Sequence, residues 1–138
     1  MKSLFDSEPI VFDVPDASII YYPNFFSTEE ATILFDTLQK EIPWQQDDIK
    51  VYGKVYPQPR LTALFGNERK SYSYSNITMH PHKWSPLLMS IKEKVEKTTE
   101  AIYSTVLLNY YRDGKDSNGW HADNEKELGT NPIIASLS

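Results

Sequence analysis

The chain has 138 residues, of which 40% are hydrophobic and 24% are charged, a composition typical of a folded globular protein. This length suits a single domain, 1–138, in which residues 1–48 form a strand-and-helix extension. The chain contains no cysteine, which excludes a disulfide framework, a thiolate zinc site and a cysteine nucleophile. We expect a reducing, intracellular setting, cytoplasmic or nuclear, and neither a membrane span nor a signal peptide. With a net charge of −5, nucleic-acid binding would need a local basic patch.

Two segments have helical patterns. The first follows a capping box at Ser27-Thr28-Glu29-Glu30 and ends before Pro43. Hydrophobic residues at helical spacing predict one buried stripe along it: Ala31, Leu34, Phe35, Leu38 and Ile42. The second helix begins after Ser85, with Pro86 in its first position, and extends toward Ile102.

Short runs rich in tyrosine and branched residues predict strands, which together with the helices indicate an α+β domain. These runs are residues 17–22, 50–56, 61–65, 72–79 and 105–111. A further strand-like stretch, 133–138, follows the turn signal Asn131-Pro132. Because a domain that ends within a strand would expose an unpaired edge, we expect the chain to be a fragment of a longer protein.

The candidate metal ligands are His121 and Asp123. On an extended segment they project to the same side, and an imidazole with a carboxylate supplies two of the three ligands of a non-haem Fe(II) site. Taken alone, the pair also fits an ordinary polar loop. Asn109 and Tyr111 have the same spacing at the end of a predicted strand. The intervening and following stretch, 113–127, has a net charge of −3 and so suits a cation better than a phosphate.

A local excess of basic residues lies at 50–70, where the net charge is +4. Tyrosine and phenylalanine interleave with these basic residues, a mixture that favours contact with phosphates and stacking on bases. The alternative interpretation is a scattered, solvated surface. His80 and His82 form a His-x-His pair that could in principle supply a metal ligand, but Pro81 and the following helix favour surface loop residues.

Five motifs in order make the chain similar to the AlkB family of Fe(II)/2-oxoglutarate-dependent dioxygenases, specifically its nucleic-acid-dealkylating members. They are VYGK (51–54), PRLTALFG (59–66), YSYSNITM (72–79), LLNYYRDGKDSNGWHADNE (107–125) and PIIASLS (132–138). The resemblance implies a double-stranded β-helix (jelly roll) buttressed by helices, with its later strands missing from this chain. It also implies Fe(II) as cofactor, with 2-oxoglutarate and O₂ as co-substrates.

The resemblance assigns a role to individual residues. His121 and Asp123 would ligate the catalytic iron, and Asn109 and Tyr111 would bind 2-oxoglutarate. The residues implied to contact the nucleic acid are Tyr52, Gly53 and Lys54 at a hairpin tip, Arg60 near the backbone, Tyr72, Ser73 and Tyr74 around a flipped base, and Asn124 and Glu125. The family usually has two acids at these last two positions, so Asn124 is a departure. The third iron ligand and two arginines that clamp 2-oxoglutarate would follow residue 138.

The implied function is oxidative demethylation of alkylated bases of the 1-methyladenine and 3-methylcytosine type. It couples 2-oxoglutarate decarboxylation to methyl hydroxylation and formaldehyde release. DNA, single- or double-stranded, is the expected partner of a monomeric enzyme, with RNA, a protein or a lipid as alternative substrates. Another alternative is a non-catalytic fragment that binds nucleic acid through residues 50–70 or does not fold alone, and we expect the 138-residue chain by itself to be inactive.

Overall fold

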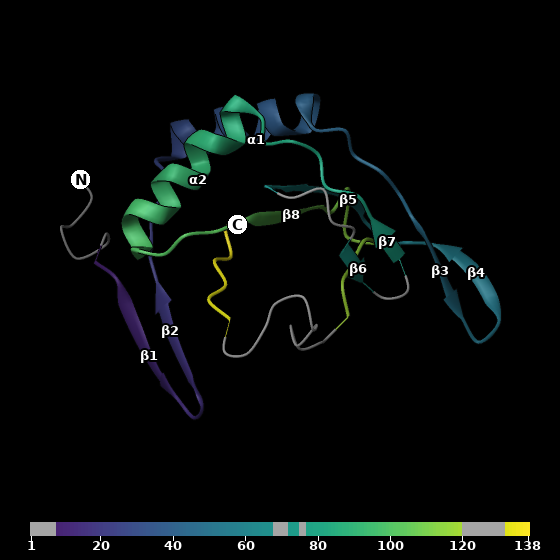
Figure 1. The fold of residues 1–138 in the computed structure, drawn as a ribbon, viewed down its shortest axis with the longest axis horizontal. Coiled ribbons are helices and arrows are strands. Elements are labelled where there is room, and N and C mark those ends of the chain that lie inside the picture. The colour runs from purple at the N-terminus through teal and green to yellow at the C-terminus, as the bar shows by residue number, and fades with distance from the viewer. Residues whose placement is uncertain (1–7, 68–71, 75–76, 120–131) are drawn as a thin grey trace. The chain divides into compact units, whose positions relative to one another are not determined.

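The computed structural model describes residues 8–67, 72–74, 77–119 and 132–138 (Figure 1). The chain divides into two compact units, Met1–Ile42 and Pro43–Ser138. The expectation of one domain over the whole chain stays a prediction. Among the described residues, no helix has the length and apolar character that crossing a membrane requires.

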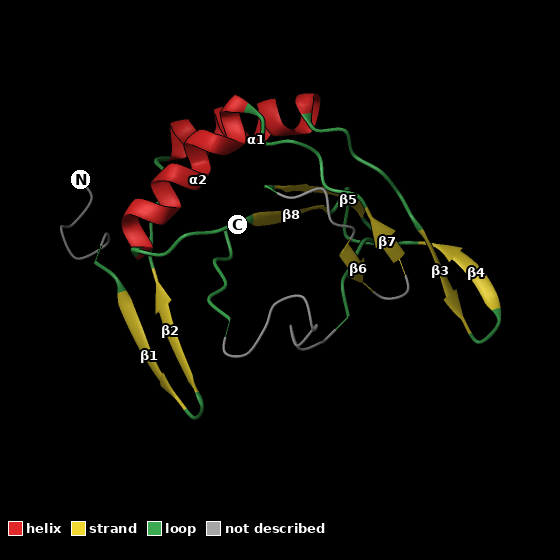
Figure 2. Ribbon diagram, viewed as in Figure 1, coloured by secondary structure: helices red, strands yellow, loops and turns green. Residues whose placement is uncertain are grey.

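The first unit consists of an antiparallel hairpin and a helix (Figure 2). Strand β1 (Ile10–Val14) pairs with β2 (Ala17–Tyr21), and helix α1 (Thr28–Glu41) follows. Asp16 closes the hairpin in a left-handed conformation, with φ at 57°. The sequence predicted β2 and α1, whereas β1 was not predicted.

Helix α1 begins as its capping box predicts. The Ser27 hydroxyl accepts a hydrogen bond from the backbone N–H of Glu30 at 3.1 Å, and the Glu30 carboxylate accepts one from the backbone N–H of Ser27 at 3.3 Å. The two contacts satisfy amide donors that a helix N-terminus otherwise leaves unpaired. The predicted start of this helix is therefore confirmed.

The predicted buried stripe of α1 is only partly correct. Leu34 and Leu38 are half-buried and Ile42 is buried, but Ala31 and Phe35 are exposed. The other elements of this unit are two short strands, and such a hairpin offers too little apolar surface to cover a whole helix face. The stripe is thus wrong at these two positions.

The described residues of the second unit form three antiparallel strand pairs and one helix: β3 (Asp48–Val51) with β4 (Lys54–Pro57), β5 (Leu61–Gly66) with β8 (Thr105–Tyr110), β6 (Tyr72–Tyr74) with β7 (Ile77–Met79), and α2 (Pro86–Thr99). The predicted run 50–56 contains β3 and β4 on either side of the hairpin tip that the resemblance implied at Tyr52, Gly53 and Lys54. The predicted run 72–79 is wrong as a single strand, because it contains two paired strands, β6 and β7. In the first run, Tyr52 and Gly53 have positive φ angles and reverse the chain. Strand β8 ends one residue before the predicted end.

The core of this unit centres on β5. Its residues from Thr62 onward are buried, and Leu64, which is 2% exposed, packs with Met79. Ile49 and Leu107 cover this pair from β3 and β8. Six register pairs join β5 to β8, from Leu61 opposite Tyr110 to Gly66 opposite Thr105. The apolar contacts and the ladder together fix the position of β8 on β5.

Helix α2 begins where the sequence predicts and ends earlier. The Ser85 hydroxyl accepts from the backbone N–H of Leu88 at 3.2 Å, and Pro86 occupies the first turn. Glu100 adopts a left-handed conformation, with φ at 58°, which ends the helix after Thr99. Ile102 lies beyond that end and is 90% exposed, so the predicted extension toward it is wrong.

The predicted strand at 133–138 is also wrong, because residues 132–138 form no strand. A strand needs a hydrogen-bonded neighbour, and no described strand pairs with this stretch. The helices and the four small antiparallel sheets agree with an α+β class and are compatible with part of a jelly roll.

Candidate co-substrate and nucleic-acid site

The predicted co-substrate residues lie at the end of β8. Asn109 is the register partner of Thr62 on β5, and its side chain is exposed. Tyr111 directly follows the strand and is 45% exposed. Both side chains can therefore be reached by a small molecule.

Arg60 contacts Asn109 and is 4% exposed. Its Nε donates to Asn109 Oδ1 at 2.9 Å, and its Nη1 donates to Asn118 Oδ1 at 3.1 Å. A buried guanidinium needs hydrogen-bond partners, and these two amide oxygens supply them. The expected contact of Arg60 with a nucleic-acid backbone stays a prediction, although its burial leaves little surface for such a contact.

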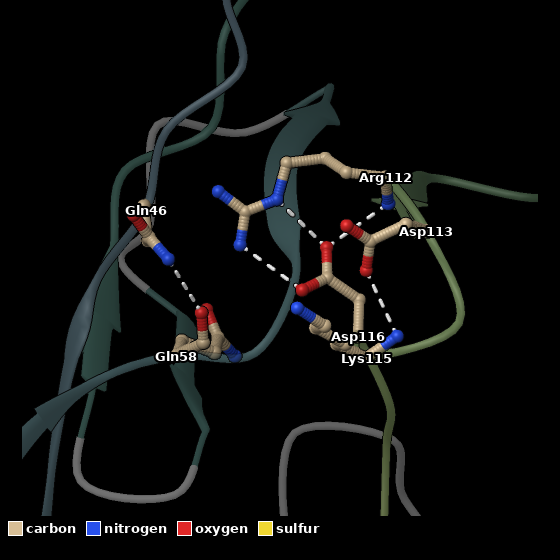
Figure 3. A network of polar contacts seen from close by, with 6 residues as sticks. All are labelled: Gln46, Gln58, Arg112, Asp113, Lys115 and Asp116. Atoms are coloured by element: carbon tan, nitrogen blue, oxygen red, sulfur yellow. Dashed lines mark hydrogen bonds and ion pairs between the residues drawn. The ribbon is translucent and has the colours of Figure 1, made fainter.

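The turn after β8 is held by an ion pair (Figure 3). Both carboxylate oxygens of Asp116 accept from the Arg112 guanidinium, at 2.7 and 3.0 Å, and the backbone N–H of Arg112 donates to the same carboxylate at 2.9 Å. The hydrogen bond from the Arg112 side chain holds the pKa of Asp116 below its ordinary value, and the pKa of Arg112 is raised in turn. The backbone N–H of Lys115 donates to Asp113 Oδ1 at 2.8 Å. These four hydrogen bonds together hold the turn at 112–116.

Three hydrogen bonds hold the residues that directly precede Arg60. The backbone N–H of Ser117 donates to the Pro59 carbonyl at 2.8 Å, which joins the turn after β8 to the start of β5. Gln46 Nε2 donates to the Gln58 carbonyl at 2.8 Å (Figure 3), and the backbone N–H of Gln58 donates to the Asp47 carbonyl at 2.7 Å. The stretch before β5 is thus held on two sides.

The β3–β4 hairpin ends in the predicted tip. Tyr52 has φ at 49° and Gly53 at 79°, the left-handed pair that a two-residue turn with matching strand twist requires. The Tyr52 ring is fully exposed. Cross-strand partners share a face of a hairpin, so Lys50, opposite Val55, and Lys54, opposite Val51, lie on opposite faces. A flat ring at the tip therefore has an exposed lysine on each side of the ribbon.

Several predicted site residues lie outside the described part of the structure. These are the iron ligands His121 and Asp123, and Asn124 and Glu125 after them. For Tyr72, Ser73 and Tyr74 the backbone is described, as β6 paired with β7, while the side chains are outside the description. The described residues contain no cluster of three or more metal-ligating side chains. The assigned roles of these residues stay predictions.

His80 and His82 are exposed, as predicted for surface loop residues. His82 uses its backbone to extend the edge of β5: its N–H donates to the Leu64 carbonyl at 2.8 Å, and its carbonyl accepts from the Gly66 N–H at 3.0 Å. Its ring packs against Phe65, with 5.3 Å between ring centroids. The structure thus gives this histidine a packing role.

The hydrogen bond between Asn118 and Arg60 could not be predicted from the amino-acid pattern. Asn118 directly precedes Gly119, a pair typical of a turn, and 58 positions separate it from Arg60. A buried arginine is the one signal that could have prompted a search for acceptors, but burial cannot be inferred from a lone arginine in a basic segment.

Comparison with known proteins shows the family to which the chain is related. The family model described as the 2OG-Fe(II) oxygenase superfamily matches residues 18–138. The mouse and human alpha-ketoglutarate-dependent dioxygenases alkB homolog 3 are 43% and 41% identical over 121 residues, 87% of this chain and 42% of each relative. The human DNA oxidative demethylase ALKBH2 is 35% identical over 120 residues, 85% of this chain and 46% of the relative.

The chain thus spans less than half the length of the relatives that it matches. The superfamily implies a jelly-roll fold, with Fe(II) and 2-oxoglutarate in its chemistry. The matches agree with the motifs that carried the sequence resemblance. The chain therefore belongs to the 2OG-Fe(II) oxygenase superfamily and, within it, to the AlkB family.

Proposed function

We propose that the protein is an Fe(II)- and 2-oxoglutarate-dependent dioxygenase that removes methyl groups from alkylated bases in DNA. Bases of the 1-methyladenine and 3-methylcytosine type are the proposed substrates, because a ring-nitrogen methyl group blocks pairing and lowers the cost of flipping. The observation that carries the proposal is the 41–43% identity to dioxygenases named alkB homolog 3 over most of this chain.

The described co-substrate residues fit 2-oxoglutarate. The Asn109 side chain is exposed and its oxygen accepts from Arg60, and within the described part of the chain its two amide N–H donors remain for a ligand. The Tyr111 hydroxyl, exposed one residue after β8, would add a third donor. Three donors suit a carboxylate, which accepts hydrogen bonds and donates none. These two side chains would orient one carboxylate of the keto acid.

An imidazole and a carboxylate are the ligand types that non-haem Fe(II) takes in oxygenases, so His121 and Asp123 would hold the metal. When bound, Fe(II) with O₂ supplies oxidation of the methyl carbon, coupled to conversion of 2-oxoglutarate into succinate and CO₂, and the hydroxylated methyl group leaves as formaldehyde. The protein would contribute positioning, with β8 held on β5 by six register pairs.

The β3–β4 hairpin supports a nucleic-acid substrate. A fully exposed aromatic ring has no folding role, and at a left-handed position it also costs backbone energy. Such a ring can insert between or stack on bases, and stacking is worth about 1–3 kcal/mol per base. Lys50 and Lys54 beside it can contact phosphates. We propose that Tyr52 displaces or stacks on a base while the lysines position the strand.

The test is formaldehyde release from a single-stranded DNA oligonucleotide that carries 1-methyladenine, with the intact gene product, Fe(II) and 2-oxoglutarate. The same oligonucleotide in RNA, and an unmethylated DNA control, define the substrate class. We expect release from methylated DNA that stops without 2-oxoglutarate and in His121→Ala. Equal release by that variant, or none by the wild-type protein, would contradict the proposal.

A further inference from the structure

Arg60 holds the side chain of Asn109, the residue proposed to bind 2-oxoglutarate, through a hydrogen bond. It is buried, whereas Asn109 is exposed, and the two are joined by a hydrogen bond of 2.9 Å from Nε to Oδ1. A guanidinium donates hydrogen bonds and accepts none, so it can pair with the oxygen of the Asn109 amide and not with its nitrogen. The contact thus decides which way the amide group points.

We propose that Arg60 is a positioning residue for 2-oxoglutarate: it holds the Asn109 carboxamide with its N–H donors turned outward, toward the co-substrate carboxylate. The inference rests on the proposed function and adds to it a residue that acts through Asn109. It differs from the role that the sequence resemblance implied for Arg60, which was contact with the nucleic-acid backbone.

Thr62 gives independent support. It is the register partner of Asn109, so their side chains share one face of the β5–β8 ladder. Its hydroxyl is buried and has no hydrogen-bond partner among the described residues. Buried polar groups are almost always paired, so the Thr62 hydroxyl is an unsatisfied polar group on the same ladder face as Asn109.

The second contact of Arg60 extends its effect along the chain. Asn118, whose oxygen accepts from Nη1, precedes the predicted iron ligand His121 by three residues. The neighbouring bond from Ser117 N–H to the Pro59 carbonyl ties the same two segments together. One buried arginine therefore connects the co-substrate strand with the segment that leads to the predicted metal ligands.

The test compares Arg60→Met, Arg60→Lys and the control Arg112→Met in the intact gene product. Arg112 is a matched arginine, since its guanidinium also bonds a side-chain oxygen but bonds Asp116 rather than Asn109. The readouts are the Kd for 2-oxoglutarate, measured by calorimetry with Mn(II) so that no turnover occurs, and the KM values for 2-oxoglutarate and for methylated DNA.

For Arg60→Met we expect the Kd and KM for 2-oxoglutarate to rise about tenfold or more, the range that outer-shell substitutions produce at metal sites, with the KM for DNA little changed. Arg60→Lys keeps a donor and should recover part of the loss, while Arg112→Met should bind 2-oxoglutarate as the wild type does. If Arg60→Met fails to fold, Arg60→Lys still decides, because the inference requires weakened 2-oxoglutarate binding there too.

Asn109→Asp provides a separate check. It keeps an oxygen acceptor for Arg60 but removes both N–H donors and adds a negative charge, so 2-oxoglutarate binding should fall by more than in Arg60→Lys. A rise in the KM for DNA alone in the Arg60 variants would overturn the inference in favour of a backbone contact. Unchanged 2-oxoglutarate binding in those variants would overturn the inference and leave the proposed function standing. A wild-type protein that binds no 2-oxoglutarate would contradict both.

Discussion

The β5–β8 ladder and the β3–β4 hairpin are both antiparallel pairs, yet they differ in almost every physical property. Nearly all of β5 is buried, and so is Arg60, the residue that directly precedes it. All of β4 is exposed, and the hairpin ends in a fully exposed tyrosine. Burial on this scale stabilises a fold, whereas exposed aromatic and basic side chains are available to a partner. On the proposed function, the ladder would therefore support the co-substrate site, and the hairpin would be the part that contacts nucleic acid.

The largest difference between the two regions should appear in stability after truncation of an apolar residue. Leu64→Ala in β5 should lower the free energy of unfolding by about 2–5 kcal/mol, because the substitution opens a cavity beside Met79. Val55→Ala in β4, at a side chain that is exposed, should change it by less than about 0.5 kcal/mol. Urea unfolding of both variants measures these changes. Equal losses in the free energy of unfolding would contradict the distinction between a supporting β5–β8 ladder and an exposed β3–β4 hairpin.

A smaller effect is expected at the hairpin turn. Gly53 has φ at 79°, where a Cβ atom strains the backbone although no neighbouring atom lies within 4 Å of its position. Gly53→Ala should therefore cost about 1–2 kcal/mol in the free energy of unfolding. Thermal unfolding measures the loss, and Gly114→Ala, at a glycine with equally open surroundings and no positive φ, is the control. An equal loss in the two variants would contradict the assignment of the cost to the left-handed backbone.

Substitution of Tyr52 should raise the stability of the fold and weaken the binding of DNA. Asn tolerates the left-handed conformation better than Tyr, so Tyr52→Asn should raise the free energy of unfolding by up to about 1 kcal/mol. The same substitution should weaken binding to single-stranded DNA by about 1–3 kcal/mol, because the stacking ring is lost. Fluorescence anisotropy with a labelled oligonucleotide measures binding, and undiminished affinity would exclude this ring from the interface.

The smallest expected effect is the pH dependence of the stability that the Arg112–Asp116 ion pair contributes in the turn after β8. The folded protein holds the pKa of Asp116 below its ordinary value, so the Arg112–Asp116 pair stabilises the fold above the ordinary aspartate pKa. That contribution is lost as the pH falls through the lowered value in the folded state. The stability difference between wild type and Asp116→Asn should thus shrink on acidification below the ordinary aspartate range. Urea unfolding across that range measures it, and a difference that grows instead would contradict the ion pair.

Local signals carried the sequence predictions that the structure confirms. The capping residues Ser27 and Ser85 fixed both helix starts, and the Tyr52-Gly53 turn placed the hairpin tip. These features depend on a few adjacent residues, whose conformational preferences act over the same short range. The end of α2 was less predictable, because it depends on one residue, Glu100, entering a left-handed conformation that its type rarely adopts.

The contacts between distant segments could not be predicted in the same way. Arg60 lies 49 positions from Asn109, and the basic segment around it favoured an exposed role in phosphate binding. Only the pairing of β5 with β8 brings the two side chains together, and that pairing depends on burial of Leu64 and its neighbours. Likewise, the strand predicted at 133–138 had the right residue types but no partner among the described strands.

The most direct measurement of the central claim is a kinetic comparison of Asn109→Ala with Tyr52→Ala in the intact gene product, titrating 2-oxoglutarate and methylated DNA separately. If β8 supports the co-substrate and the hairpin contacts the nucleic acid, the first variant should raise the KM for 2-oxoglutarate alone and the second the KM for DNA alone. The division of the site between these two regions would be contradicted if either variant raised both KM values. It would also be contradicted if Asn109→Ala raised only the KM for DNA, or Tyr52→Ala only the KM for 2-oxoglutarate.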